Sequence, residues 1–119
     1  MPTNIAAILI VAPAGRVRDS LRVLLKSTRP LIRIDWAEEI DRLADIPPTL
    51  VLLDATLPND RAWQALEHIQ QHYPQHRCLI LAHSSEHQKR AQAAGAQAIR
   101  LEGLTAARLF ATVEEAAIS

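Results

Sequence analysis

Short, almost uninterrupted apolar runs recur along this 119-residue chain, and they constrain its fold more than any other feature. Three of them, at residues 5–12, 50–53 and 78–82, have the length of strands that are buried on both faces. A fourth run, at 31–36, alternates apolar with charged residues, as is typical of an edge strand with one wetter face. A fifth run, at 98–101, follows a Gly-Ala pair. The runs predict five strands in a sheet that is covered on both faces.

Amphipathic segments separate the apolar runs. Apolar residues recur at helical spacing in two of them, as Val17, Leu21, Leu24 and Leu25 and as Trp63, Leu66 and Ile69. A third segment follows this spacing less strictly, with Leu104, Ala107, Leu109, Val113 and Ala117. Two shorter helices are predicted at 38–44 and 85–94, with Gly95 ending the second one. Asn59 or Asp60 is the predicted cap of the middle helix.

Strand and helix thus follow each other five times, and this order predicts the fold class. Short connections between alternating elements imply right-handed crossovers, parallel strands and helices on both faces of the sheet. We predict an α/β fold with a flavodoxin-like, doubly wound, five-stranded parallel sheet in the order 2-1-3-4-5. A chain of this length encloses one core, so residues 1–119 are expected to form a single domain.

The composition narrows the classes of function. Aromatic residues make up 3% of the chain, so the core must be aliphatic. Basic and acidic residues number 13 each, and this balance predicts no nucleic-acid binding by the domain. The single cysteine, Cys78, is expected to be a buried small hydrophobe in a cytoplasmic, reducing environment. The apolar stretch 5–13 is far shorter than the about 20 residues that span a bilayer, so no export signal and no membrane span are predicted.

Asp54 is the charged residue whose position says most about where a functional site lies. It ends the apolar run at 50–53, and open parallel sheets bind their ligands beside the carboxyl ends of such strands. A carboxylate there is a candidate for chemistry. The alternative interpretation is that Asp54 ends the strand and caps the following turn, a common role of aspartate.

The residues around Asp54 are similar to those of a known family. The chain reads Leu-Asp-x-x-Leu-Pro at positions 53–58 and Gly-Ala at 95–96, within the five-fold strand and helix order. In this it resembles the receiver domains of two-component response regulators, over essentially its entire length. The resemblance implies that Asp54 is the phosphoacceptor, a carboxylate nucleophile that takes a phosphoryl group from a histidine kinase or phosphotransfer protein with the help of Mg²⁺.

The chain departs from the family at the residues that assist this chemistry. Where the family has an acidic pair after the first strand, positions 11–14 read Val-Ala-Pro-Ala. Aligning the Gly-Ala pair puts Glu102 at the position of the family's lysine. The family's switch hydroxyl has three candidate positions, Ser84, Ser85 and His83, of which the strand alignment favours His83.

These departures favour an atypical receiver, or pseudo-receiver. A Mg²⁺ ion would retain only Asp54 and Thr56 as ligands, which makes a weak or absent site. The main hypothesis is a receiver-type signalling domain of a phosphorelay. The alternative is a phosphorylation-independent module for protein interaction or dimerisation. An enzyme that uses Asp54 or His83 as acid or base is disfavoured, because no glycine-rich phosphate loop follows the first strand, and we expect no enzymatic activity.

The resemblance also suggests two interaction surfaces. Arg16, Arg18 and Arg22 form a basic face on the first helix, which is solvated surface in the simpler interpretation and in receivers docks the phosphotransfer partner. The last strand and helix correspond to the family's self-association surface, through which a partner protein or a homodimer is expected to dock. Its residues here are Arg100, Leu104, Arg108 and Glu114.

Five histidines are spaced in steps of four. His68, His72 and His76 form one series, and His83 and His87 form another. Histidines four residues apart on a helix are able to chelate a transition metal. No cysteine or acidic residue completes an obvious ligand set, and His68 and His72 are expected on the solvated side of their helix, so metal binding is the minority interpretation.

Overall fold

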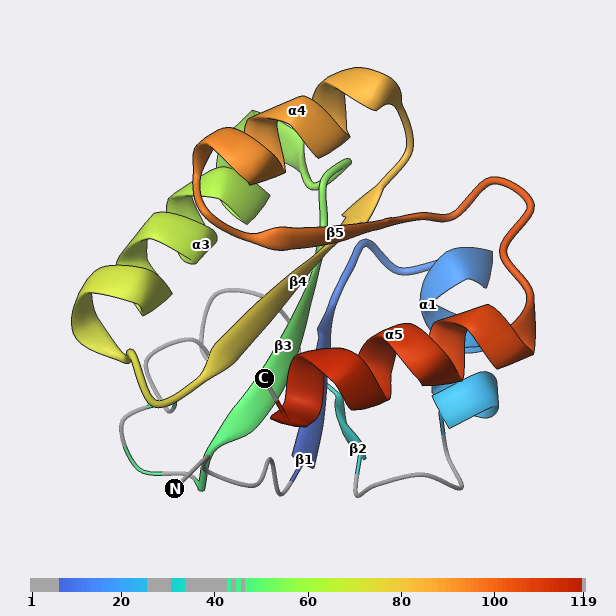
Figure 1. The fold of residues 1–119 in the computed structure, drawn as a ribbon, viewed down its shortest axis with the longest axis horizontal. Coiled ribbons are helices and arrows are strands. Elements are labelled where there is room, and N and C mark those ends of the chain that lie inside the picture. The colour runs from blue at the N-terminus through green and yellow to red at the C-terminus, as the bar shows by residue number, and fades with distance from the viewer. Residues whose placement is uncertain (1–6, 26–30, 34–42, 44, 46, 119) are drawn as a thin grey trace.

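The computed structural model describes residues 7–25, 31–33, 43, 45 and 47–118. Within them the chain forms one parallel sheet (Figure 1), whose strands are β1 (Ala7–Val11), β2 (Leu31–Arg33), β3 (Thr49–Asp54), β4 (Arg77–Ala82) and β5 (Gln97–Arg100). The strands lie in the order β2-β1-β3-β4-β5, the order predicted from the alternation of strand and helix. The ends of the first two predicted strands, at 5–6 and 34–36, lie outside the described residues.

Helices cover both faces of this sheet (Figure 1). They are α1 (Arg16–Leu25), α3 (Arg61–His72), α4 (Ser85–Ala93) and α5 (Ala106–Ile118), and a 3-10 turn, η2 (Pro58–Asp60), precedes α3. Of the helix predicted at 38–44, only Leu43 is among the described residues. No helix in the described part of the chain has the length and apolar character needed to cross a bilayer.

The core consists of two apolar layers, one on each side of the sheet. Every residue of β1 and β3 is buried. Because successive side chains of a strand point to opposite faces, Val51 and Leu53 join the layer under α3 and α4, whereas Leu50 and Leu52 join the layer under α1 and α5. Burying each such side chain contributes about 1.5–3 kcal/mol, and this holds β1 and β3 at the centre of the domain.

The helical stripes agree with the sequence pattern for α3 and only in part for α5. The stripe Trp63, Leu66 and Ile69 is buried, as predicted. On α5 the buried residues are Leu109, Val113 and Ala116, whereas Ala107 is exposed. The prediction for Ala107 is wrong because a residue two positions before Leu109 lies on the opposite side of a helix. Leu104 precedes α5 and packs partly buried against the core.

Two further expectations concern the end of α4 and the cysteine. Gly95 adopts a left-handed φ of 73°, and the N–H of Ala96 donates to the carbonyl of Ala91 at 2.9 Å, so the predicted glycine stop is confirmed. Cys78 is only partly buried, although it packs against the apolar layer under α3 and α4. The difference from the predicted burial follows from its place in β4, because the first two residues of this strand are less buried than the last four.

Candidate functional site

Asp54 lies at the floor of a small crevice at the carboxyl end of the sheet. It is the last residue of β3, and only 2% of its surface is exposed. The crevice has a volume of about 140 Å³, and it is lined by Pro13, Ala14, Gly15, Arg16, Asp54, Thr56 and His83. These residues come from the ends of β1, β3 and β4, which are neighbours in the sheet. The crevice therefore lies at the switch point where the sequence predicts a ligand site.

One oxygen of the Asp54 carboxylate accepts three hydrogen bonds. The backbone N–H of Thr56 donates to Oδ1 at 2.8 Å, and the Thr56 hydroxyl donates to the same atom at 2.7 Å. His83 Nε2 is the third partner, at 2.9 Å. The bond from the N–H two residues ahead is the usual turn-capping bond of aspartate, so the alternative role foreseen for Asp54 is confirmed alongside its place in the crevice.

His83 supplies the basic group of the site. It follows the last residue of β4, and about 30% of its side chain is exposed, against 3% for Asp54. Because an ionised carboxylate only accepts hydrogen bonds, His83 Nε2 carries the hydrogen that it donates to Asp54. The backbone N–H of His83 donates to Nδ1 of His87 at 3.0 Å, which fixes the chain at the start of α4.

The two serine candidates lie elsewhere. Ser84 is the N-cap of α4, and its Oγ accepts from the N–H of His87 at 3.2 Å. Ser85 Oγ accepts from Arg100 Nη1 at 3.4 Å. Among the three candidates for the switch hydroxyl, the structure therefore brings only His83 to Asp54. Ser84 instead satisfies a free amide in the first turn of α4.

Glu102 does not join the crevice. Its side chain is 82% exposed and forms an ion pair with Arg100 Nη2 at 3.1 Å. The negative charge of Glu102 is therefore paired with the last residue of β5 and does not face Asp54. Arg100 in turn donates from Nη1 to Gln88 Oε1 at 3.4 Å. Its guanidinium thus lies against α4.

The residues around Asp54 fit a Mg²⁺ ion of the receiver kind poorly. Mg²⁺ prefers six oxygen ligands in octahedral geometry. The described residues contain no group of three or more His, Cys, Asp or Glu side chains able to hold a metal. The Thr56 hydroxyl is directed to Asp54 Oδ1, which already accepts three hydrogen bonds, and positions 12–14 bring no side-chain oxygen.

A cluster next to the crevice has no counterpart in the sequence predictions. The ring of Trp63 lies 6.4 Å from that of His87, and the Arg90 guanidinium carbon lies 4.6 Å from the centre of Trp63. Arg90 also pairs with Asp60 at 3.4 Å. Asp60 is the N-cap residue of α3, as predicted, but its side chain makes no capping bond. The carboxylate turns instead to Arg90, and Asp60 itself has a left-handed φ of 58°.

His76 is a structural residue rather than a member of a helical histidine series. Helix α3 ends at His72, and His76 is 5% exposed. Its Nδ1 accepts from the N–H of Thr49 at 3.0 Å, so its Nε2 carries a hydrogen and donates to the Leu43 carbonyl. Pro74 is the signal that could have indicated this, because the residue before a proline rarely continues a helix.

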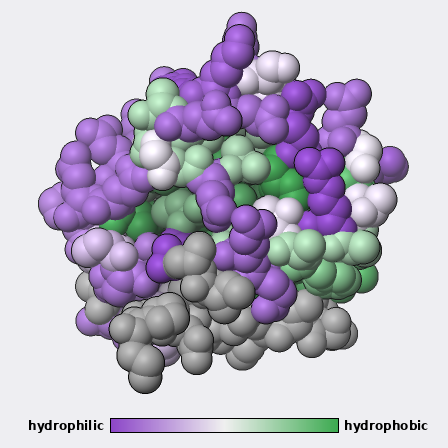
Figure 2. All heavy atoms as spheres, in the orientation of Figure 1, coloured by the Kyte–Doolittle hydropathy of each residue, from purple (hydrophilic) through white to green (hydrophobic). Residues whose placement is uncertain are grey.

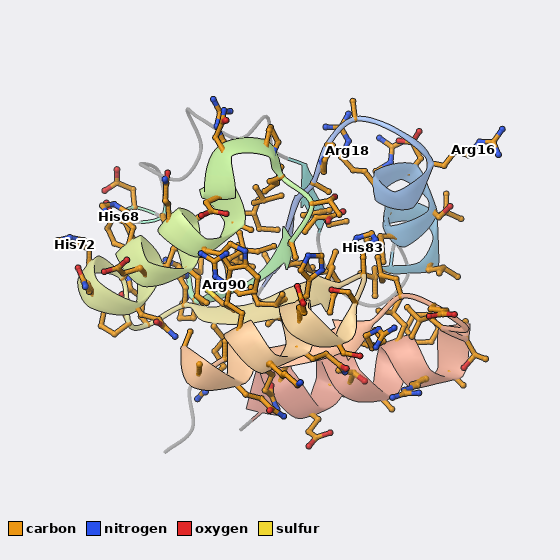
Figure 3. All side chains as sticks on the ribbon, turned by 90° about the horizontal axis from the view of Figure 1, so that it is seen from above. Arg16, Arg18, His68, His72, His83 and Arg90 are labelled. Carbon is orange, nitrogen blue, oxygen red and sulfur yellow. The ribbon has the colours of Figure 1, made fainter. Side chains whose placement is uncertain are left out.

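The basic residues of α1 differ in their placement (Figure 3). The side chain of Arg16 points outward from the start of α1, although the residue lines the crevice. Arg18 is only partly exposed, and its Nε is buried without a hydrogen-bond partner. His83 lies between the sheet and α1 in the same view. Arg16 and His83 are therefore the two basic residues that line the crevice around Asp54.

Comparisons with known proteins address the fold. No family model and no curated protein matches the chain. Among solved structures, it is similar to the N-terminal signal receiver domain of a two-component response regulator from Bacteroides fragilis, with 18% identity, 97% of this chain and 98% of that chain covered, and a TM-score of 0.85. A CheY-like receiver domain protein from Methanospirillum hungatei matches with 22% identity, 93% and 92% coverage, and a TM-score of 0.76.

Full-length FixJ from B. japonicum is similar to the chain as well. Identity is 24%, the TM-score is 0.79, and the match covers 96% of this chain and 58% of FixJ. At these identities the similarity establishes the fold alone. The chemistry of the site has to be inferred from its own residues. The chain has the fold of the response regulator receiver domains, with Asp54 at the end of β3.

Proposed function

We propose that this chain is a receiver-type signalling domain of a two-component response regulator that works without phosphorylation, as a pseudo-receiver. Its fold is that of receiver domains, and Asp54 ends β3 as the family's phosphoacceptor does. The observation that carries the proposal is the hydrogen bond from His83 Nε2 to Asp54 Oδ1. A basic side chain thus holds the carboxylate that a phosphorelay leaves accessible for attack.

The hydrogen bonds on Asp54 oppose its use as a nucleophile. Three donors stabilise the charged carboxylate oxygen, and each of them lowers its readiness to attack phosphorus. A hydrogen bond to a charged group is worth about 1.5–3 kcal/mol. Phosphorylation at Oδ1 would have to break or reorganise these bonds before any new contact forms.

The charge balance of the crevice opposes phosphorylation as well. A phosphoryl group brings about two negative charges, which phosphotransfer enzymes neutralise with a metal ion and a cationic side chain. Here the acidic pair that would hold Mg²⁺ is replaced by Ala12 and Pro13, and the family's lysine is missing, because Glu102 occupies its position and pairs with Arg100 outside the crevice. We infer that the domain uses no Mg²⁺, has no catalytic activity and needs no histidine kinase or phosphotransfer protein.

The signal in this proposal passes through a protein contact at β5 and α5. A partner protein or a second copy docks there, and Arg108 is an exposed residue of α5 suited to that contact. Arg108→Glu should break the association, whereas the matched reversal Arg22→Glu on α1 should leave it intact. Sedimentation velocity measures self-association, and a pull-down with the full-length protein measures a partner. A strictly monomeric protein with no partner in either assay would reject this surface.

A magnesium titration tests the receiver site itself. In wild-type protein, the backbone amide signals of Thr56 and His83 should not move as Mg²⁺ is added. A repaired variant carrying Ala12→Asp, Pro13→Asp, His83→Thr and Glu102→Lys should show saturable shifts near Asp54, because it regains the carboxylates that hold the ion. Saturable Mg²⁺ shifts in the wild type would contradict the proposal.

A further inference from the structure

Two of the histidine pairs four residues apart, His68 with His72 and His83 with His87, make different contacts in the structure. His83 and His87 are engaged in the candidate site, because His83 Nε2 binds Asp54 and His87 Nδ1 accepts from the backbone of His83. Their ring centres are 6.1 Å apart and the rings are edge to face. His68 and His72 on α3 have ring centres only 4.6 Å apart. In the described part of the chain, neither of these two rings takes part in a hydrogen bond or ion pair.

The spacing of the His68 and His72 rings matches that of two ligands on one metal ion. A metal–nitrogen bond of about 2.1 Å places the centre of an imidazole about 3 Å from the ion. Two imidazoles bound at adjacent positions then have centres about 4.5–5 Å apart. The observed 4.6 Å between the ring centres of His68 and His72 falls within this range. Figure 3 shows both labelled residues at the same end of α3.

The position of His68 and His72 at the C-terminal end of α3 favours the binding of a cation. His72 is the last residue of α3, and His68 lies one turn before it. The final turn of a helix carries free carbonyl groups and the negative end of the helix dipole, which attract positive charge. His68 is half-buried and His72 is exposed, so both side chains have surface in contact with solvent.

We propose that His68 and His72 form a binding site for one divalent transition-metal ion such as Ni²⁺, Cu²⁺ or Zn²⁺. Imidazole nitrogen suits these ions and does not suit Mg²⁺. His76 is not a ligand, because both of its ring nitrogens are bonded to backbone groups in the core. No third His, Cys, Asp or Glu joins the pair within the described residues, so water fills the remaining positions on the ion.

Calorimetric titration of the untagged full chain with Ni²⁺ alone tests the site. We expect one ion per chain, and His68→Gln or His72→Gln should each weaken binding about tenfold or more. The matched control is His87→Gln, which alters the other histidine pair and should leave Ni²⁺ binding unchanged. With Cu²⁺, electron paramagnetic resonance should show two nitrogen ligands in the wild type and one in each single variant.

Two results would overturn the proposal. One is the absence of saturable binding up to about 1 mM Ni²⁺. The other is equal affinity in the wild type and in a folded His68→Gln/His72→Gln double variant. The His68→Gln and His72→Gln changes affect side chains that are not buried in the core, so the single and double variants are expected to fold. Circular dichroism checks this. The site is remote from Asp54 in the sequence and in its contacts, so either outcome leaves the pseudo-receiver proposal to its own tests.

Discussion

His83 Nε2 lies 2.9 Å from Oδ1 of Asp54, and this contact links the ends of two neighbouring strands. Asp54 stands opposite Leu81 in the register of β3 and β4, so His83 lies two residues beyond that partner and reaches back over the crevice. The contact gives the buried carboxylate a basic partner from β4. In the family that the chain resembles, the corresponding cation is expected from β5.

The Asp54–His83 contact should stabilise the fold measurably. His83→Ala removes a hydrogen bond to a buried carboxylate, and we expect the free energy of unfolding to fall by about 1–3 kcal/mol. His83→Gln retains an N–H donor and should lose less. Urea denaturation of both variants provides the measurement. Equal stability of His83→Ala and the wild type would mean that the contact contributes nothing to the folded state.

Replacing His76 should be more costly, because His76 satisfies two backbone groups at once. His76→Phe keeps a ring of similar shape but leaves the Thr49 N–H and the Leu43 carbonyl without their partner. Each unsatisfied buried group costs about 1–3 kcal/mol, so a loss of about 2–5 kcal/mol is expected in chemical denaturation. His72→Phe on the exposed end of α3 is the control. A similar small effect of both changes would refute a structural role for His76.

The Cys78 thiol should resist ionisation. Burial raises the pKa of Cys78 from 9.0 to about 12. Because the pKa is higher in the folded state, the associated stability is present below pH 9 and is lost as the pH rises toward 12. The difference in unfolding free energy between wild type and Cys78→Ala should therefore shrink over this interval. A difference that stays constant up to pH 12 would contradict the shift.

The rate of alkylation is a second measure of how far the Cys78 thiol resists ionisation. Thiolate is the reactive form, so iodoacetamide should modify Cys78 much more slowly in folded protein than in urea-unfolded protein. Equal rates in the two states would show that the folded chain leaves the sulfur accessible and ionisable.

Arg90 should matter through Trp63 more than through Asp60. The Arg90 and Asp60 side chains are both more than half exposed, and such ion pairs contribute little. Asp60→Asn keeps a residue that tolerates the left-handed backbone and should change stability by less than about 0.5 kcal/mol. Arg90→Ala also removes the contact with the Trp63 ring and should cost about 0.5–1 kcal/mol more. Lys89→Ala is the neighbouring control, and an equal effect of all three changes would contradict this ranking.

The sequence was sufficient to predict the sheet and the place of Asp54, because both follow from hydrophobic periodicity. Continuous apolar runs require burial on both faces of the sheet. A charged residue at the end of such a run therefore lies where the strand ends, as Asp54 does at the carboxyl end of β3. Gly95 was predictable for a similar reason, since its left-handed φ is rare for other residues.

The partners of Asp54 could not be predicted to the residue. The identity of the residue that meets Asp54 depends on the register of β3 against β4, and a shift of one or two positions exchanges His83 for a serine. The engagement of Ser84 in capping α4 depends on where that helix begins. The spacing of His72 and His76 suggests one helical face, although Pro74 lies between them and α3 has already ended.

We propose that the Asp54 site has lost phosphoryl chemistry and that His83 holds its carboxylate instead. Intact mass after treatment with a small-molecule phosphoryl donor and Mg²⁺ tests it most directly, with Asp54→Ala as the blank. The wild type should keep its mass, and the variant with Ala12→Asp, Pro13→Asp, His83→Thr and Glu102→Lys should gain one phosphoryl group. A phosphoryl group that is found on the wild type and is absent from Asp54→Ala would show that Asp54 is still a phosphoacceptor.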